Sequence, residues 1–210
     1  MGEVLSIDGP LVRLHLPGVR SGEQVRVGEL GLVGEVIGLD GERALAQLYE
    51  ESGGLRPGEI AEALGQPLSV ELGPGLLGQI FDGVQRPLGE LYKESGDFIG
   101  RGLHLPALDR ERRWTFQPEA DLTPGAMLTA GSLLGRVAET GSIEHRILVP
   151  PNSDGELIEL ASAGEYAVED VVAHVRDTAG KTHKLRLFHR WPVRTPRPYT
   201  ARSHAVSPLT

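Results

Sequence analysis

The chain has no cysteine, few aromatic residues and no long apolar run, and each of these absences excludes a class of protein. Without cysteine there is neither a disulfide framework nor a thiolate metal site. No stretch of about 18 apolar residues occurs, so the sequence predicts no membrane-spanning helix. The net charge of -8 argues against a general binder of nucleic acid or of anionic membrane surfaces.

Glycine and proline are abundant, with 28 Gly and 15 Pro in 210 residues. A chain that turns so often favours short strands over long helices. The first residues lack the basic segment and the apolar region of a secretory signal peptide, so we expect a cytoplasmic protein.

Residues 1–65 are strand-like throughout and predict a small closed β-barrel. Five or six short runs of apolar residues are separated by turn residues. Asp40-Gly41 lies between the run 31–39 and the run 43–49, which is a strong hairpin signal. Closing the strands into a barrel would hide their edges.

Residues 66–108 form a connector in which we predict one short helix. A strand over 68–72 is followed by a glycine turn and then by apolar residues at helical spacing. Pro87 interrupts this pattern, and the next apolar residues continue it for a further turn or two. The apolar positions are Leu76, Leu77, Ile80, Phe81 and Val84, then Leu88, Leu91 and Tyr92.

Residues 109–190 return to strands and show a weak internal repeat, in which each half is a short strand, a glycine and another short strand. Two such halves resemble the barrel-sandwich hybrid of biotinyl and lipoyl carriers. Residues 173–175 and 185–188 predict a closing hairpin, and the proline-rich segment 191–210 predicts an extended linker. The predicted fold class is therefore mainly β, with an N-terminal barrel, a short helical connector and a second β domain.

Two glycine motifs resemble phosphate-binding loops, but their surroundings argue against that use. The stretch 73–78 fits G-x-G-x-x-G, yet the region about 20 residues on, where a dinucleotide site needs an acidic residue at a strand end, is a turn. Gly180-Lys181-Thr182 lacks the earlier glycine of a phosphate loop and precedes a strand pattern instead of a helix. We interpret the first as a tight strand-to-helix turn and 177–180 as a hairpin turn.

The histidines and arginines favour packing and contact roles. The seven His have no ligand spacing, so we expect no metal site. Arginines gather around two tryptophans, an arrangement that nucleic-acid binders also use. A domain or subunit contact in which arginine pairs with acidic residues is the interpretation that we favour. The clusters are Arg110, Arg112 and Arg113 around Trp114, and Arg186, Arg190, Arg194, Arg197 and Arg202 around Trp191.

Several stretches, in chain order, resemble the catalytic A subunit (alpha chain) family of V/A-type ATP synthases. They cover 31–42, 70–78, 80–88 and 191–198, of which Phe-Asp-Gly-Val-Gln-Arg-Pro-Leu over 81–88 and the last stretch are highly specific. Residues 107–110 and 145–151 also resemble the insertion that distinguishes A subunits from the F-type catalytic subunit.

The resemblance implies a division of labour along the chain. Residues 1–65 would join a crown ring of alternating A and B subunits, and 109–190 would be a bulge domain that contacts peripheral-stalk subunits. The segment 191–210 would lead towards a nucleotide-binding domain, and the phosphate-binding loop would lie beyond these 210 residues.

It follows from the resemblance that ATP synthesis or hydrolysis, coupled to proton or sodium transport, belongs to the parent subunit. ATP or ADP with Mg²⁺ would be bound there, so we expect no catalytic, nucleotide-binding or metal residue and no cofactor in this chain. We also expect it to lie peripheral to the membrane as part of the complex, without membrane insertion or nucleic-acid binding.

Asp82 and Arg86, within the specific motif, are the possible interface residues. We expect them to form a local ion pair or an interface contact. The alternative is a solvent-exposed pair, worth less than about 1 kcal/mol.

Two other functions remain open from the sequence. The chain could be a naturally short assembly or regulatory protein that binds V-type subunits. It could also be a biotinyl or lipoyl carrier, but a carrier needs a lysine at the hairpin tip between its halves, and 139–151 contains none.

Overall fold

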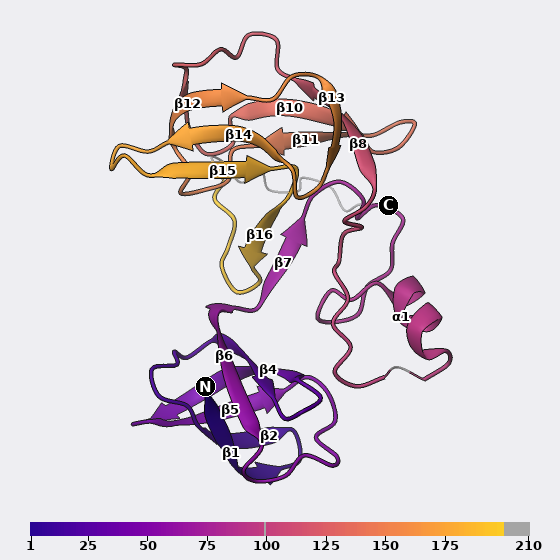
Figure 1. The fold of residues 1–210 in the computed structure, drawn as a ribbon, viewed down its shortest axis with the longest axis vertical. Helices are drawn as coiled ribbons and strands as arrows, with labels where there is room; N and C mark the ends of the chain where they lie inside the picture. Colours follow the sequence, from indigo (N-terminus) through magenta and orange to yellow (C-terminus); the bar gives the residue numbers. More distant parts are fainter. Residues whose placement is uncertain (99, 200–210) are drawn as a thin grey trace, which may run out of the picture.

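The computed structural model describes residues 1–98 and 100–199, which form two β domains joined by a connector. In Figure 1 the N-terminal barrel lies at the bottom, the second domain lies at the top, and the connector with its short helix lies to one side. The mainly β fold class predicted from the sequence is confirmed.

The first six strands close into an antiparallel barrel in the order β1-β2-β5-β4-β3-β6. Its hairpins follow the turn residues. Asp40 pairs with Arg43 across the predicted hairpin, and Gly41 takes the φ of 60° that the tight turn requires. The strands are β1 Gly2–Asp8, β2 Leu11–His15, β3 Glu23–Val27, β4 Leu32–Asp40, β5 Arg43–Leu48 and β6 Ile60–Pro67.

The barrel core is filled by small aliphatic side chains. Along β2, Val12 and Leu14 are fully buried while Arg13 between them is exposed, which is the alternation that a strand imposes. The 13 residues of this core are Val, Leu and Ala, without an aromatic ring among them. A narrow six-stranded barrel leaves room inside for side chains of this size.

The connector contains one helix, α1 (Leu88–Ser95), which coincides with the further turn or two expected from Leu88, Leu91 and Tyr92. The predicted helix over 76–84 is wrong. That segment forms a loop closed by a bridge between Phe81 and Pro87, in which the Asp82 side chain accepts backbone N–H bonds. An aspartate that binds its own backbone competes with a helix, and the flanking glycines weaken it further.

The second domain packs two four-stranded sheets against each other, in the orders β11-β10-β8-β13 and β15-β14-β12-β9. The predicted closing hairpin is β14 with β15. The strands are β8 Arg113–Pro118, β9 Met127–Leu128, β10 Leu133–Ala138, β11 Glu144–Leu148, β12 Gly155–Leu160, β13 Gly164–Ala167, β14 Val171–Arg176 and β15 Thr182–Arg186.

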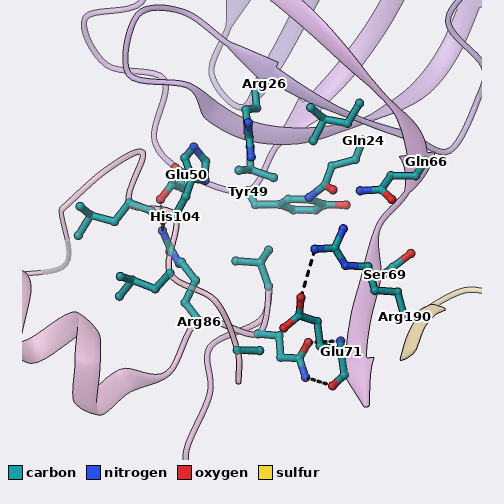
Figure 2. Close-up of a pocket in the computed structure, with 17 residues that line it drawn as sticks. Gln24, Arg26, Tyr49, Glu50, Gln66, Ser69, Glu71, Arg86, His104 and Arg190 are labelled. Atoms are coloured by element: carbon teal, nitrogen blue, oxygen red, sulfur yellow. Dashed lines mark hydrogen bonds and ion pairs between the residues drawn. The ribbon is translucent and has the colours of Figure 1, made fainter. Parts of the chain in front are cut away.

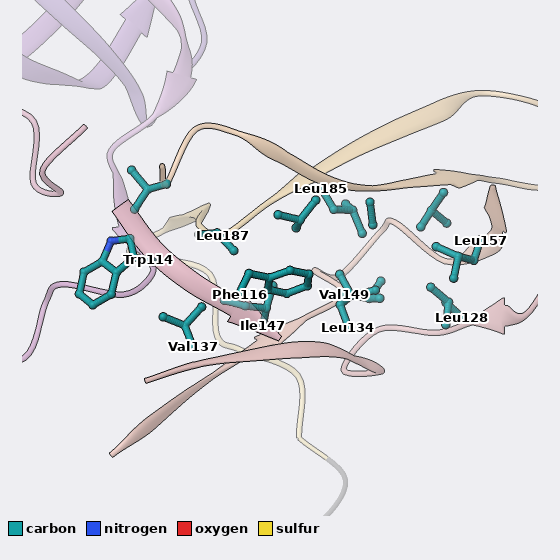
Figure 3. Close-up of a cluster of buried hydrophobic side chains, with 14 of the residues drawn as sticks. Trp114, Phe116, Leu128, Leu134, Val137, Ile147, Val149, Leu157, Leu185 and Leu187 are labelled. Carbon is teal, nitrogen blue, oxygen red and sulfur yellow. The ribbon is translucent and has the colours of Figure 1, made fainter. Parts of the chain in front are cut away.

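The core of the second domain is larger and contains aromatic rings (Figure 3). Phe116 is fully buried between the sheets, and Trp114 on the same strand closes one end. Gly135 on the neighbouring strand makes room for the phenyl ring, since a Cβ there would lie 2.5 Å from its edge. Any larger residue at 135 would displace Phe116.

A two-stranded ribbon joins the domains. Strand β7 (Ser69–Leu72) enters the second domain, and β16 (His189–Pro192) leaves it, paired antiparallel with β7 (Figure 1). Two segments about 120 residues apart in the chain are therefore held side by side. Of the linker expected over 191–210, Trp191 and Pro192 belong to β16, whereas 200–210, with Arg202, lie outside the described residues.

Candidate functional site

A polar cavity of about 210 Å³ lies where the barrel, the connector and the β7–β16 ribbon meet, and we call this region the junction. Figure 2 shows charged and amide side chains from all three parts pointing into it. The labelled residues are Gln24, Arg26, Tyr49, Glu50, Gln66, Ser69, Glu71, Arg86, His104 and Arg190.

The loop over 81–87 is the centre of the junction. Its turn is held by the Asp82 carboxylate, whose Oδ1 accepts the N–H groups of Val84 at 3.1 Å and Arg86 at 2.8 Å. Gln85 adopts a φ of 65°, in the left-handed region that residues other than glycine rarely enter. The local hydrogen bonds hold this strained residue, and the side chains of Gln85 and Arg86 reach different parts of the molecule.

Arg86 ties the loop to the barrel. Its Nε lies 2.7 Å from Asp82 Oδ2 and its Nη1 lies 2.5 Å from Glu50 Oε1, just beyond the end of β5. The same guanidinium donates to the main-chain oxygen of Leu103 at 3.2 Å. Burial opposes the charged guanidinium, but the bonds to Asp82 and Glu50 outweigh it and raise the pKa of Arg86.

The expected ion pair between Asp82 and Arg86 is therefore present, and it is not solvent-exposed. The two side chains are 16% and 12% exposed, and Glu50 is 8% exposed. The alternative of an exposed pair is wrong because the barrel and the residues around Leu103 cover the loop. That Asp82 and Arg86 also contact another subunit stays a prediction.

Gln85 ties the same loop to β7. Its Oε1 accepts the N–H of Glu71 at 2.6 Å, and its Nε2 donates to the Glu71 main-chain oxygen at 2.8 Å. The side-chain amide thus pairs with the strand as a neighbouring strand would. Gln85 lies inside one of the two highly specific motifs, but this role could not be predicted from the sequence because a left-handed backbone leaves no trace in residue type.

Glu71 joins the two arginine clusters. Its Oε1 accepts from Arg110 Nη2 at 2.5 Å and lies 3.2 Å from Arg190 Nη2. Arg110 also pairs with Glu169 at 3.1 Å and stacks over Phe188. The expected pairing of arginines with acidic residues at a domain contact is confirmed here, within the chain.

Another ion pair runs from the end of the ribbon to the barrel. Arg194 binds Glu35 on β4 through two bonds, with Nε 2.8 Å from Oε1 and Nη2 2.8 Å from Oε2. The Tyr49 hydroxyl donates to the same carboxylate at 2.7 Å. The bond to Arg194 lowers the pKa of Glu35 in spite of burial, whereas burial and the bond to Glu35 raise the pKa of Tyr49 to about 12.

The two glycine motifs are structural. No helix follows Gly78 directly, so that half of the expected strand-to-helix turn is wrong. The Gly75 and Leu77 N–H groups donate to Glu139 Oε1 at 2.7 and 3.2 Å, so an internal carboxylate occupies the donors that a phosphate would need. The hairpin turn over 177–180 is confirmed, with Asp177 Oδ1 accepting from Ala179 and Lys181.

The histidines do not share a common site. His183 pairs with Asp177 at 2.8 Å, and His145 pairs with Glu139 at 3.1 Å, while His189 belongs to β16. No group of three or more potential metal ligands occurs among residues 1–98 and 100–199. That part of the chain also contains no helix with the length and apolar character needed to cross a membrane.

Two family models match the chain and coincide with its two β domains. The model for the ATP synthase alpha/beta family, beta-barrel domain, matches residues 4–65. The model for the barrel-sandwich domain of the ATPsynthase alpha/beta subunit matches residues 105–194. The chain belongs to the ATP synthase alpha/beta family. The resemblance read from the sequence motifs is thereby confirmed.

Members of this family are similar to the chain along its whole length. The V-type ATP synthase alpha chain of Nitrosococcus oceani is 58% identical over 209 residues, covering 100% of this chain and 35% of that protein. The A subunit of the A-type ATP synthase of Thermococcus onnurineus is 49% identical over 210 residues, covering 100% and 36%. The corresponding protein of Methanopyrus kandleri is 49% identical over 209 residues, covering 99% and 35%. This family member thus matches the N-terminal part of these proteins and spans about a third of their length.

Proposed function

We propose that this chain supplies the ring-forming and partner-binding part of the A subunit of a V/A-type ATP synthase, which alternates with the B subunit in a ring. ATP synthesis or hydrolysis, with bound ATP or ADP and Mg²⁺, and the coupled ion transport would reside in the portion of the subunit that this chain does not span. The protein would act in the cytoplasm, peripheral to the membrane, with the second domain available to stalk subunits.

The observation that carries this proposal is the position of exposed apolar residues on the barrel. On β4, Ile37 and Leu39 are 44% and 47% exposed. On the paired strands β1 and β6, Leu5 and Ile60 are 38% and 47% exposed. Single exposed apolar residues are normal on a protein surface. These four, however, form two groups, one on β4 and the other on the paired strands β1 and β6.

The two groups lie on different sides of the barrel. In the closed order β1-β2-β5-β4-β3-β6, β4 is two positions away from β6 and three away from β1. Each barrel therefore presents two separate apolar surfaces. Head-to-tail contacts between different surfaces generate a ring when the rotation from each subunit to the next adds up to a full turn.

The charged junction supports the same role. Ring contacts through the barrel are useful only if the barrel keeps a fixed orientation to the rest of the subunit. Arg86 to Glu50 and Arg194 to Glu35 fix that orientation through directional, charge-assisted hydrogen bonds.

The test is assembly with a V-type B subunit, followed by native mass spectrometry. The unchanged chain should give closed alternating rings, whereas Ile37→Asp or Ile60→Asp, each blocking one surface, should stop at open pairs. Gln47→Asp, an exposed change on β5, is the matched control and should still give rings. Rings that form equally well with both barrel variants would refute the proposal, as would ATP hydrolysis by the chain alone.

A further inference from the structure

The largest cavity described in the second domain is an open groove of about 720 Å³ beside the edge of one sheet. Strand β11, which is the edge strand of its sheet, forms one wall. The lining also includes Arg186 and Leu187, where the chain leaves β15, and Arg197 to Tyr199 beyond the ribbon. We call this the edge groove, and none of the contacts described above for the junction uses it.

The edge groove is cationic in an acidic protein. Three arginines line it, Arg146, Arg186 and Arg197, and none of its lining residues is Asp or Glu. In contrast, Arg86, Arg190 and Arg194 of the junction each bind a carboxylate. A positive lining without acidic partners attracts a negatively charged ligand.

The groove arginines have no carboxylate partner among the described residues. Arg186 Nε donates to the Glu169 main-chain oxygen at 2.9 Å, and Arg197 approaches His189 at 3.0 Å while it stacks over Trp191. Arg146 is exposed on β11 and has no side-chain hydrogen bond or ion pair within residues 1–98 and 100–199. Their guanidinium groups are therefore available to a ligand.

His189, one of the two histidines of the groove, contributes little charge near neutral pH. Burial, and then the nearby charges of Arg197 and His145, lower the pKa of His189 to about 4, so its imidazole is neutral. His145 is held by Glu139, which lies behind the groove wall and is almost fully buried. The three arginines are the fixed positive charges of the edge groove.

Strand β11 also offers backbone groups. It pairs with β10 on one side, and within the described residues no backbone hydrogen bond engages Glu144–Leu148 on the other side. An unpaired strand edge is a template for an added strand. Leu148, which is 38% exposed, and Pro150 and Pro151 give the same wall an apolar component.

We propose that the edge groove binds an acidic, extended segment of a partner protein, which adds a strand to the outer edge of β11 and sets its carboxylates against Arg146, Arg186 and Arg197. Hydrogen bonds from the backbone of the segment to β11 align the two strands, and the pairing of its carboxylates with the arginines selects an acidic sequence. Apolar residues at alternate positions contact Leu148 and the two prolines.

This surface is separate from the barrel surfaces proposed for ring formation. Ile37→Asp and Ile60→Asp should leave peptide binding unchanged, and changes to the groove arginines should leave rings intact. The two proposals therefore fail independently.

The probe is a fluorescein-labelled ten-residue peptide in which aspartate alternates with valine and serine, measured by fluorescence anisotropy against the full chain. Arg146→Glu combined with Arg186→Glu should weaken binding by about tenfold or more, because two attractions become repulsions. The control Arg13→Glu combined with Arg43→Glu changes net charge equally on exposed barrel positions and should weaken it by less than about threefold. A matching lysine peptide should not bind.

A second measurement tests strand addition with the protein unchanged. The same aspartate peptide, N-methylated at alternate residues, keeps its charge but loses the N–H groups along one edge, so it should bind at least about tenfold more weakly. Hydrogen exchange should show protection of the amides over 145–148 with the unmodified peptide only. Equal binding of the N-methylated peptide, or equal losses in the groove and barrel variants, would overturn the proposal.

Discussion

The interiors of the two domains and the junction between them are held by different forces. Each domain closes around its own apolar cluster, and neither cluster takes residues from the other domain. The junction instead relies on Arg86, Glu71 and Arg194, which reach across between parts of the chain. Apolar packing is strong and non-directional, whereas charge-assisted hydrogen bonds are directional.

The apolar cores therefore provide most of the folding free energy, and the junction determines the relative orientation of the two domains. A partly buried ion pair gains little net free energy over apolar contact because both charges lose water. It does fix the angle between the groups that it joins. The domains should therefore fold as separate units whose relative orientation depends on a few charged side chains.

The largest effect should come from emptying one core. Phe116→Ala removes the fully buried ring of the second domain and should destabilise that domain by about 3 to 5 kcal/mol. Leu14→Ala should destabilise the barrel by about 2 to 5 kcal/mol. Hydrogen exchange under native conditions, read by mass spectrometry on peptides from each domain, measures both changes in one experiment.

The comparison between cores and junction requires that each substitution act locally. Peptides from β2 and β5 should lose protection in Leu14→Ala alone, and peptides from β8 and β10 in Phe116→Ala alone. Equal loss of protection in both domains from either variant would show one cooperative unit, and the distinction between cores and junction would fail.

The barrel was predictable because its strands carry local signals. Alternation at Val12, Arg13 and Leu14 and the glycine at 41 specify strand and turn without distant partners. The same reasoning failed at 76–84, where apolar spacing mimics a helix. There Asp82 satisfies the backbone N–H groups locally and Gln85 pairs with Glu71, 14 residues earlier.

The junction was predictable only in outline. Residue type indicated that the late arginines would meet acidic partners, and Asp82 and Arg86 were identified as a pair. The partners Glu35, Glu50 and Glu71 lie up to 159 residues from their arginines. Nothing in a single sequence selects them among 29 carboxylates, because the choice is made by how the two domains pack.

The second largest effect should come from removing the Arg86 side chain from the junction. Arg86→Ala leaves the mostly buried Asp82 and Glu50 without their cation and should cost about 2 to 3 kcal/mol. It should also broaden the distance distribution between spin labels placed on the barrel and on the second domain. Denaturant unfolding and pulsed electron spin resonance measure the two consequences.

Arg113→Ala is the matched control for that experiment. Its partner is Asp170, and the two side chains are 60% and 44% exposed, so its loss should cost less than about 1 kcal/mol and leave the distance distribution narrow. Arg86→Lys keeps the charge but not the fork that reaches both carboxylates, and it should fall between the two. If the distance distribution between the spin labels does not broaden in Arg86→Ala, then Arg86 does not fix the orientation of the domains.

The smallest effect is a pH window set by the barrel end of the junction. The pKa of Glu35 is lowered, so its stabilising contribution is present above its usual pKa and is lost as the pH falls through the lowered value. The pKa of Tyr49 is raised to about 12, so its contribution is complete below pH of about 10 and is lost as the pH rises towards 12. Between about pH 5 and pH 10 both groups support the contact with Arg194.

Absorbance at the phenolate wavelength reads the alkaline end of this window, which Tyr49 sets. The chain should show a tyrosine step near pH 12 that Tyr49→Phe removes and that Tyr166→Phe, which alters a hydroxyl bound to the Ser162 carbonyl oxygen, leaves in place. In Arg194→Gln the pKa of Glu35 should rise, because the largest influence that lowers it is gone. If the step near pH 12 persists in Tyr49→Phe, the step belongs to another tyrosine, and the bond from Tyr49 to Glu35 does not set the alkaline limit of the window.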